Sequence, residues 1–380
     1  MDDNVSVWPG LAVLFSAAVA LLVCNVGFDS YYDTFWGSEL LNLHNHDISM
    51  RFVVNEILMV LFFFYITLEI KYEYLYGVLQ SPKERVMPAL AALGGMVGPA
   101  CIYLLVAARV YTHGWAIPVA TDIAFSLACL MLVGQRLPVS LRVFLMSLAI
   151  FDDLGAIAII AVYYTAHYSW YLLAGTFASI TYLTIISRLR AHVTLYILGG
   201  LMLWVLCFLS GVHMTLAGVA IAAFLPMKND MGLWAMRIHH ACGKVVQYFI
   251  MPVFAFANAG VALHEVAGSL NSSLALAIAL GLLIGKPLGI LSVCILSEYL
   301  GVAQMPKSMH KRHLLGVSFL CAIGFTMSLF IGNLAFKSMP DAVLDIVRVS
   351  VIGASTLAGI IGILILLFCV KVDNNEKRKI

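Results

Sequence analysis

The sequence predicts an all-α membrane protein with about twelve transmembrane helices, and three observations support this fold class. Hydrophobic residues make up 62% of the 380 residues and charged residues only 11%, whereas soluble domains carry about 25% charged residues. Apolar runs long enough to cross a bilayer recur along the chain. Lys and Arg are concentrated in every second connection between these runs. A water-soluble fold is therefore excluded.

The composition also argues against several kinds of site. The net charge of +2, with no basic run and no Gly-rich phosphate loop, gives no reason to expect a nucleic-acid partner. The eight cysteines show no CxxC spacing and lie mostly in apolar runs, so we expect small buried side chains rather than disulfides or metal ligands. The first apolar run follows Met-Asp-Asp-Asn instead of a basic stretch, which favours a first membrane helix over a signal peptide.

The apolar runs place the predicted spans along the whole chain. A long periplasmic loop is predicted at about 28–50, and the segments 115–132 and 212–226 are shorter or richer in Gly and Pro than the rest. The predicted spans lie near residues 8–27, 52–70, 86–108, 115–132, 141–165, 170–187, 193–210, 212–226, 244–262, 272–297, 312–336 and 345–371.

Most of the 22 Lys and Arg residues fall in alternate connections, starting with the one after the second span. The opposite set holds only Arg51, Arg109, Lys337 and Arg348. By the positive-inside rule the richer set is cytoplasmic. A multi-pass protein with both termini in the cytoplasm is therefore expected.

Two of the predicted spans contain signals for a break at mid-membrane. Pro118 lacks a backbone N–H and interrupts the helix just before Thr121 and Asp122. The span 312–336 contains Ile-Gly-Phe-Thr-Met-Ser, with Gly324 at its centre. Unwound backbone at membrane depth is tolerated only inside protein or beside water.

Each predicted break lies in the middle helix of a three-helix unit, the units being about 86–165 and 272–371. The first unit starts in the cytoplasm and the second outside, so together they predict an inverted repeat with two broken, crossing helices. In transporters this arrangement forms the substrate site. We therefore expect one transmembrane transporter domain over residues 1–380. The alternative is two ordinary Gly or Pro kinks, and the buried charges decide against it.

Four charged residues are predicted at membrane depth: Asp122, Asp152, Asp153 and Lys286. Each costs about 2.5–3.5 kcal/mol at the centre of a membrane helix. Asp122 suits the positive N-terminal ends of half-helices, whereas Lys286 suits their negative ends or one of the paired aspartates. One carboxylate is left without a counter-charge.

That carboxylate must hold a proton or a metal cation, because burial and a neighbouring acid disfavour its bare ionised form. Carboxylate, hydroxyl and carbonyl oxygens suit a hard cation such as Na⁺, so protons and Na⁺ compete for Asp152 and Asp153. The alternatives are a buried ion-pair network that only fixes helix packing, and for Lys286 a purely counter-charge role.

Six stretches of the chain resemble the bacterial sodium/proton antiporter A (NhaA) family, whose inverted repeat is already a known example of this architecture. The resemblance covers about residues 50–340 in one order. The stretches that carry it are Gly-Trp-Ala-Ile-Pro-Val-Ala-Thr-Asp-Ile-Ala-Phe at 114–125, Leu-Ala-Ile-Phe-Asp-Asp-Leu-Gly-Ala-Ile at 148–157, Ser-Gly-Val-His-Met-Thr-Leu-Ala-Gly at 210–218, Phe-Ala-Phe-Ala-Asn-Ala-Gly at 254–260, Gly-Leu-Leu-Ile-Gly-Lys-Pro-Leu-Gly-Ile at 281–290 and Gly-Phe-Thr-Met-Ser at 324–328.

The resemblance implies a role for each of these residues. Asp153 is the principal cation and proton carboxylate with Asp152 beside it, Lys286 pairs with Asp152 when protons are bound, and Thr121 and Asp122 lie at the helix crossing. It further implies electrogenic export of Na⁺ or Li⁺ for more protons than cations, in a bacterial inner membrane. A homodimer formed through the periplasmic region is also implied, and no cofactor is expected.

Members of this family are inactive in acid and become active as the pH rises, and the resemblance assigns part of this response to Glu69 and to the region of His239 and His240. Here the second stretch reads Arg-Ile-His-His, where the family has an acid before a single histidine, so a shifted pH profile is expected. The alternative for these three residues is a solvated interfacial position. His213 is a further candidate, although a hydrogen-bonded packing histidine is the simpler interpretation.

Three other functions fit the residues less well. An intramembrane aspartyl protease needs its two aspartates on separate helices, and a polyprenyl transferase needs two DDxxD-like motifs. A passive cation channel does not need a salt-bridged pair at broken helices. We therefore expect a transporter and not an enzyme.

Overall fold

The computed structural model describes residues 7–377, apart from short gaps at 44–45, 78, 81, 135–136, 165–169, 190–192, 211, 228–229, 267, 269–271 and 307–308. The chain forms two compact units. The first comprises residues 1–32, 78–156 and 258–380, and the second residues 33–77 and 157–257. Several basic residues used for the orientation lie outside the described residues, namely Arg136, Arg190, Lys228, Lys307, Arg378 and Lys379.

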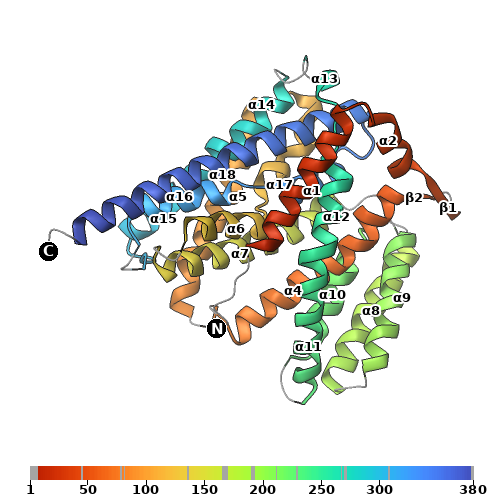
Figure 1. Ribbon diagram of the computed structural model, residues 1–380. Helices are drawn as coiled ribbons and strands as arrows, with labels where there is room; N and C mark the ends of the chain where they lie inside the picture. Colours follow the sequence, from red (N-terminus) through yellow and green to blue (C-terminus); the bar gives the residue numbers. More distant parts are fainter. Residues whose placement is uncertain are drawn as a thin grey trace. The chain divides into compact units, whose positions relative to one another are not determined.

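The first unit is helical, and its longest helix is α18 (blue in Figure 1). By residue range, 33–37 of α2 and 157–163 of α7 belong to the second unit. The elements are α1 (Trp8–Asn25), α2 (Asp29–Gly37), α5 (Pro82–Val106), the 3₁₀ helix η2 (Arg109–Val119), α6 (Ile123–Val133), α7 (Val139–Tyr163), α13 (Leu263–Val266), α14 (Ser273–Leu280), the π-helical turn η5 (Gly281–Gly285), α15 (Lys286–Tyr299), α16 (Lys311–Cys321), α17 (Phe325–Ala335) and α18 (Asp341–Lys377).

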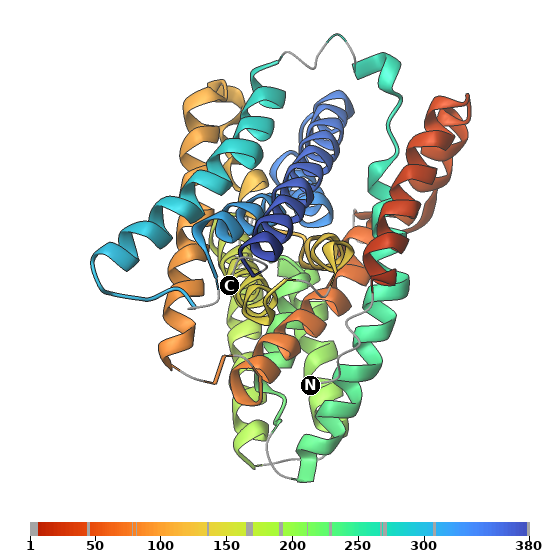
Figure 2. The same cartoon turned by 60° about the vertical axis from the view of Figure 1, so that its left-hand side comes forward.

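The second unit contains a small hairpin and further helices. Its helices α8 and α9 lie side by side in both views (Figures 1 and 2). The elements are β1 (Glu39–Leu43), β2 (His46–Ser49), α3 (Met50–Phe52), the π-helical turn η1 (Val53–Leu58), α4 (Met59–Leu75), α8 (Trp170–Leu189), α9 (Val193–Ser210), α10 (Thr215–Phe224), α11 (Asp230–Val245), the π-helical turn η3 (Val246–Ile250) and α12 (Met251–Ala259).

Among the described residues, six helices are long and apolar enough to cross a membrane, or up to eight when each of two bent pairs counts as one span. The bent pairs are η2 with α6, at 49°, and α16 with α17, at 45°. The predicted all-α membrane fold and the break in each of the two segments are thus confirmed. The count of about twelve spans and the inverted repeat stay predictions.

The segment at about 28–50, predicted as a periplasmic loop, contains a short helix and a hairpin. Residues Asp29–Gly37 form a helix, and β1 pairs antiparallel with β2, with Asn42 opposite Asp47 and Leu41 opposite Ile48. The ladder pairs backbone N–H and C=O groups that a loop would leave to water, and the sequence offered no alternating pattern long enough to predict it.

Glycines bring α5 and α15 into backbone contact in the first unit. A Cβ at Gly94 would overlap the carbonyl of Gly289, and a Cβ at Gly98 would overlap the carbonyl of Gly285. Lipid tails are as apolar as the side chains of a membrane helix, so no hydrophobic force drives helices together in lipid. They associate through close packing of this kind instead. The two Gly-x-x-x-Gly pairs place Lys286 at this tight interface.

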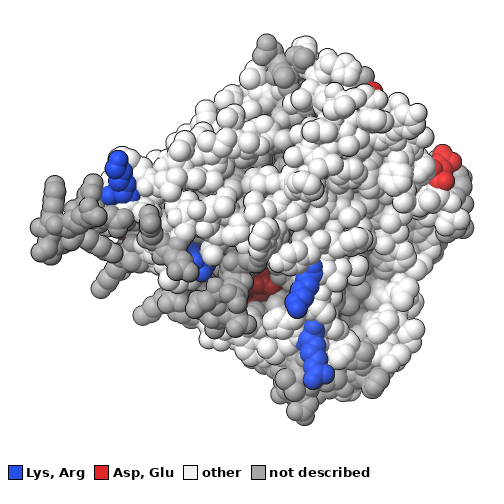
Figure 3. Space-filling view, viewed as in Figure 1, with Lys and Arg blue, Asp and Glu red and all other residues white. Residues whose placement is uncertain are grey.

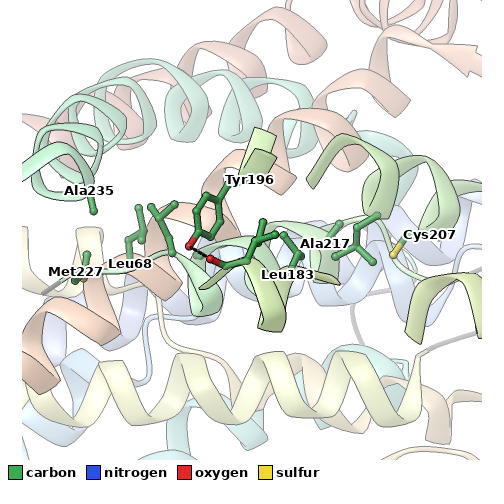
Figure 4. Close-up of a cluster of buried hydrophobic side chains, with 11 residues drawn as sticks. Leu68, Leu183, Tyr196, Cys207, Ala217, Met227 and Ala235 are labelled. Atoms are coloured by element: carbon green, nitrogen blue, oxygen red, sulfur yellow. Dashed lines mark hydrogen bonds between the residues drawn. The ribbon is translucent and has the colours of Figure 1, made fainter. Parts of the chain in front are cut away.

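The second unit has its own apolar core, contributed by α4 and α8–α11 (Figure 4). Leu68, Leu183, Tyr196 and Ala217 lie in it with almost no exposed surface. The Tyr196 hydroxyl donates to the Ile186 carbonyl at 3.1 Å, so its polar atom is paired inside this core.

Large apolar side chains cover much of the surface. Leu105, Phe177 and Phe368 are 85%, 63% and 65% exposed. The face shown in Figure 3 carries only isolated Lys, Arg, Asp and Glu side chains among the described residues. A surface of this kind is stable against lipid and not against water.

Candidate functional site

The site is built where the two bent pairs of the first unit meet. The chain leaves η2 at Val119, runs extended through Ala120 to Asp122, and becomes helical again at Ile123. The second pair is interrupted between Cys321 and Phe325. The backbone N–H of Asp122 donates to the carbonyl of Ile323 at 2.7 Å, which joins the two breaks and pairs polar groups freed by the unwinding.

The Asp122 carboxylate caps two helices at once. It is 1% exposed, and its Oδ1 accepts from the Phe125 N–H at 3.0 Å as the N-cap of α6. Its Oδ2 accepts from the Thr326 N–H at 3.2 Å and from the Thr326 hydroxyl, in the first turn of α17. The N-terminal ends of helices carry partial positive charge, so this carboxylate is compensated without a cation.

Asp152, in the middle of α7, contacts the buried lysine. Both Asp152 and Lys286 are 0% exposed, and Lys286 Nζ lies 2.6 Å from Asp152 Oδ2. The ammonium also donates to the carbonyl of Val119, at the end of η2. The Thr121 hydroxyl lies 2.5 Å from the same Asp152 oxygen and 2.8 Å from the carbonyl of Cys321, so one hydroxyl hydrogen is shared between two acceptors.

Asp153, the next residue of α7, is 4% exposed. Within the described residues, Oδ1 of Asp152 and Oδ1 of Asp153 are buried without a hydrogen-bond partner. Buried polar atoms of this kind are rare in native proteins and call for a functional explanation. Carboxylate oxygens of this kind are suitable ligands for a proton or a hard cation.

The residues predicted to respond to pH all belong to the second unit. His239 Nε2 lies 2.5 Å from Glu69 Oε2, and the imidazole stacks on Tyr65 and Tyr72 at centroid distances of 5.6 and 5.1 Å. His240 is exposed, with its ring 5.4 Å from that of His239. His239 is therefore buried in a specific contact, instead of lying solvated at an interface.

His213 adopts the simpler of its two predicted arrangements. Its Nε2 lies 3.1 Å from the carbonyl of Tyr164, so this nitrogen is the donor and the histidine ties two segments of the second unit together.

The structure buries three further charged residues that the sequence did not predict to be buried. Glu56 in η1, Glu73 in α4 and Arg348 in α18 are also buried, at 8%, 7% and 5% exposure. Arg348 was assigned to a connection, but it lies inside α18 and pairs with Asp345 one turn earlier at 2.7 Å. The burial of Glu56 could have been predicted from the sequence, because this acid interrupts the apolar run 53–66.

A helical multi-pass protein whose two broken helices meet beside buried charged side chains has the architecture of a secondary transporter. The model of one transporter family, Na+/H+ antiporter 1, matches residues 4–366, and the chain belongs to this family.

Several similar proteins are named Na(+)/H(+) antiporter NhaA. An Na(+)/H(+) antiporter NhaA of Mesorhizobium japonicum is 42% identical over 369 residues, which are 94% of this chain and 91% of that protein. The protein of that name from Paramagnetospirillum magneticum is 43% identical over 364 residues, 95% and 94% of the two chains. The one from Vibrio cholerae is 42% identical over 361 residues, 93% of each chain. The resemblance seen in the sequence is thereby confirmed.

Proposed function

We propose that the protein is an electrogenic Na⁺/H⁺ antiporter that exports Na⁺ or Li⁺ in exchange for protons, at a ratio of two protons per cation. The observation that carries this proposal is the pair of buried, unpartnered oxygens on Asp152 and Asp153, next to the Lys286–Asp152 ion pair. The family membership and the names of the similar proteins support it.

The exchange follows from charge balance at these three side chains. With protons bound, Asp153 is neutral and Lys286 is an ammonium paired with Asp152, so the three side chains sum to zero. A cation on the oxygens of Asp152 and Asp153 displaces the proton of Asp153. It also competes with Lys286 for Asp152, and a buried ammonium that loses its partner loses its proton. Two protons leave for one cation, and the reverse sequence reloads the site without a cofactor.

Everted membrane vesicles that contain the protein test the exchange. Adding Na⁺ or Li⁺ to vesicles that hold a proton gradient is expected to collapse the gradient, and vesicles without the protein provide the control. A passive cation channel, the competing function, would instead carry Na⁺ without moving protons. A gradient that survives Na⁺ addition would exclude the antiporter.

Unequal exchange makes the transport sensitive to voltage. Each net charge moved couples to the membrane potential by about 2.3 kcal/mol per 100 mV. We expect the rate of Na⁺ movement in proteoliposomes to rise when a potassium diffusion potential drives positive charge in the direction of proton movement, and to fall when the potential is reversed. The same rate at both signs of potential would exclude the two-to-one ratio.

The Glu69–His239 contact suits a pH response. The His239 imidazole on α11 lies against the Glu69 carboxylate and stacks on the rings of Tyr65 and Tyr72, all three on α4, so this contact holds α11 against α4. We infer that this closed contact accompanies the inactive state. His239→Gln is expected to shift the pH of half-maximal exchange to lower values. His240→Gln, at the exposed neighbour, is the matched control, and equal profiles for both variants would contradict this role.

The same proposal includes location and assembly. We assign the protein to the bacterial inner membrane with both termini in the cytoplasm, as a homodimer that uses the β1–β2 hairpin. Native mass spectrometry of the purified protein tests the dimer, because deleting the hairpin should leave only monomers. Protease protection of a C-terminal tag in intact cells tests the orientation.

A further inference from the structure

Two buried serines join the two bent pairs to each other. The Ser126 hydroxyl, on α6, donates to the Leu320 carbonyl near the end of α16 at 2.7 Å. The Ser328 hydroxyl, on α17, donates to the Ile117 carbonyl near the end of η2 at 2.6 Å. Both serines are 0% exposed. A Cβ at Gly324 would overlap Ser328 Oγ, so the glycine in the break leaves room for this hydroxyl.

The arrangement is reciprocal. Each serine is the fourth residue of the helix that follows a break, and each donates to the end of the helix that precedes the other break. The last carbonyls of a helix have no intrahelical donor, and an unpaired carbonyl at membrane depth is costly. The Ser328 hydroxyl supplies a donor to the Ile117 carbonyl. The Ser126 hydroxyl adds a second donor to the Leu320 carbonyl, which also accepts from the Ile323 N–H at 3.2 Å. The two serine bonds cross-link the bent pairs.

Each serine holds the segment that positions one partner of Asp152. Leu320 precedes Cys321, whose carbonyl accepts from Thr121. Ile117 lies two residues before Val119, whose carbonyl accepts from Lys286. Thr121 and Lys286 both contact Oδ2 of Asp152.

We propose that Ser126 and Ser328 are positioning residues of the exchange reaction. They contact neither cation nor proton, and they act by fixing the two carbonyls that orient Thr121 and Lys286 against Asp152. This inference rests on the proposed antiport.

Serine-to-alanine variants in everted vesicles test the proposal. We expect Ser126→Ala and Ser328→Ala each to raise the Na⁺ concentration for half-maximal exchange about threefold to tenfold, the factor that one buried hydrogen bond contributes. Ser126→Thr and Ser328→Thr keep the hydroxyl and are expected to restore the wild-type value. The maximal rate per protein should change less than the half-saturating concentration.

Ser318 offers a matched control. It is also 0% exposed, but its hydroxyl donates at 2.7 Å to the Leu315 carbonyl in its own helix, and the described residues give it no bond to another segment. Ser318→Ala should leave the half-saturating Na⁺ concentration unchanged. If the alanine variants at 126 and 328 match the Ser318 variant, the positioning role is wrong, whether or not the threonine variants fold. A wild-type protein that moves no protons on Na⁺ addition would overturn the proposed antiport, and this inference with it.

Discussion

Asp153→Asn is expected to abolish Na⁺-driven proton movement, lowering its rate by at least about a hundredfold, or roughly 2.7 kcal/mol of transition-state free energy. Asparagine keeps the shape of the side chain but neither ionises nor carries an exchangeable proton at physiological pH. The neutral amide removes a buried carboxylate whose Oδ1 has no hydrogen-bond partner among the described residues, so the site loses the group that binds a cation and a proton in turn.

Binding can be measured separately from transport in this variant. A ligand that binds only the folded protein raises its unfolding temperature. Na⁺ should stabilise the purified wild-type protein and leave Asp153→Asn unaffected. Asp345→Asn is the control, because it removes a carboxylate from the Asp345–Arg348 pair on α18 and should preserve both exchange and Na⁺ stabilisation. Undiminished exchange by Asp153→Asn would show that the transported cation binds elsewhere.

The charged residues of the site could be predicted from the sequence, because the free-energy cost of a charge in an apolar membrane helix makes such residues rare. A carboxylate or ammonium in an apolar run is expensive, so Asp122, Asp152, Asp153 and Lys286 stood out without any structure. The choice of partner was not predictable from the residues alone. Neighbouring residues on a helix point about 100° apart, and which aspartate meets Lys286 depends on how α7 packs near the α5–α15 interface.

Other parts of the site gave weaker signals or none. A serine in an apolar helix is common, so nothing in the sequence indicated that the Ser126 hydroxyl crosses to Leu320. Arg348 was missed because basic residues near the end of a span are usually assigned to the connection. The His239–Glu69 contact spans 170 residues, and only the fold brings the two side chains together.

Removing Lys286 alone is expected to cause the largest loss of stability. The ammonium and Asp152 are both fully buried, so Lys286→Met leaves a carboxylate without its counter-charge. Breaking one side of a buried ion pair costs about 3–5 kcal/mol, whereas replacing both partners by neutral residues costs little. Asp152→Asn should destabilise in the same way. The double variant Lys286→Met/Asp152→Asn should recover most of the unfolding temperature of the wild-type protein.

Thermal unfolding of the four proteins in detergent gives the coupling between the two residues directly. Lys244→Met, at an exposed lysine of α11, is the control and should change stability by no more than about 0.5 kcal/mol. If the losses of the two single variants simply add in the double variant, the ion pair does not determine stability.

The double variant also tests where the second proton resides. With Lys286 and Asp152 both neutral, only Asp153 still exchanges a proton for a cation, so one charge replaces one charge. Exchange by this variant is therefore expected to continue without net charge movement and to become insensitive to membrane potential, whereas the wild-type rate responds to it. Voltage-dependent exchange by the double variant would place the second proton on a group other than Lys286.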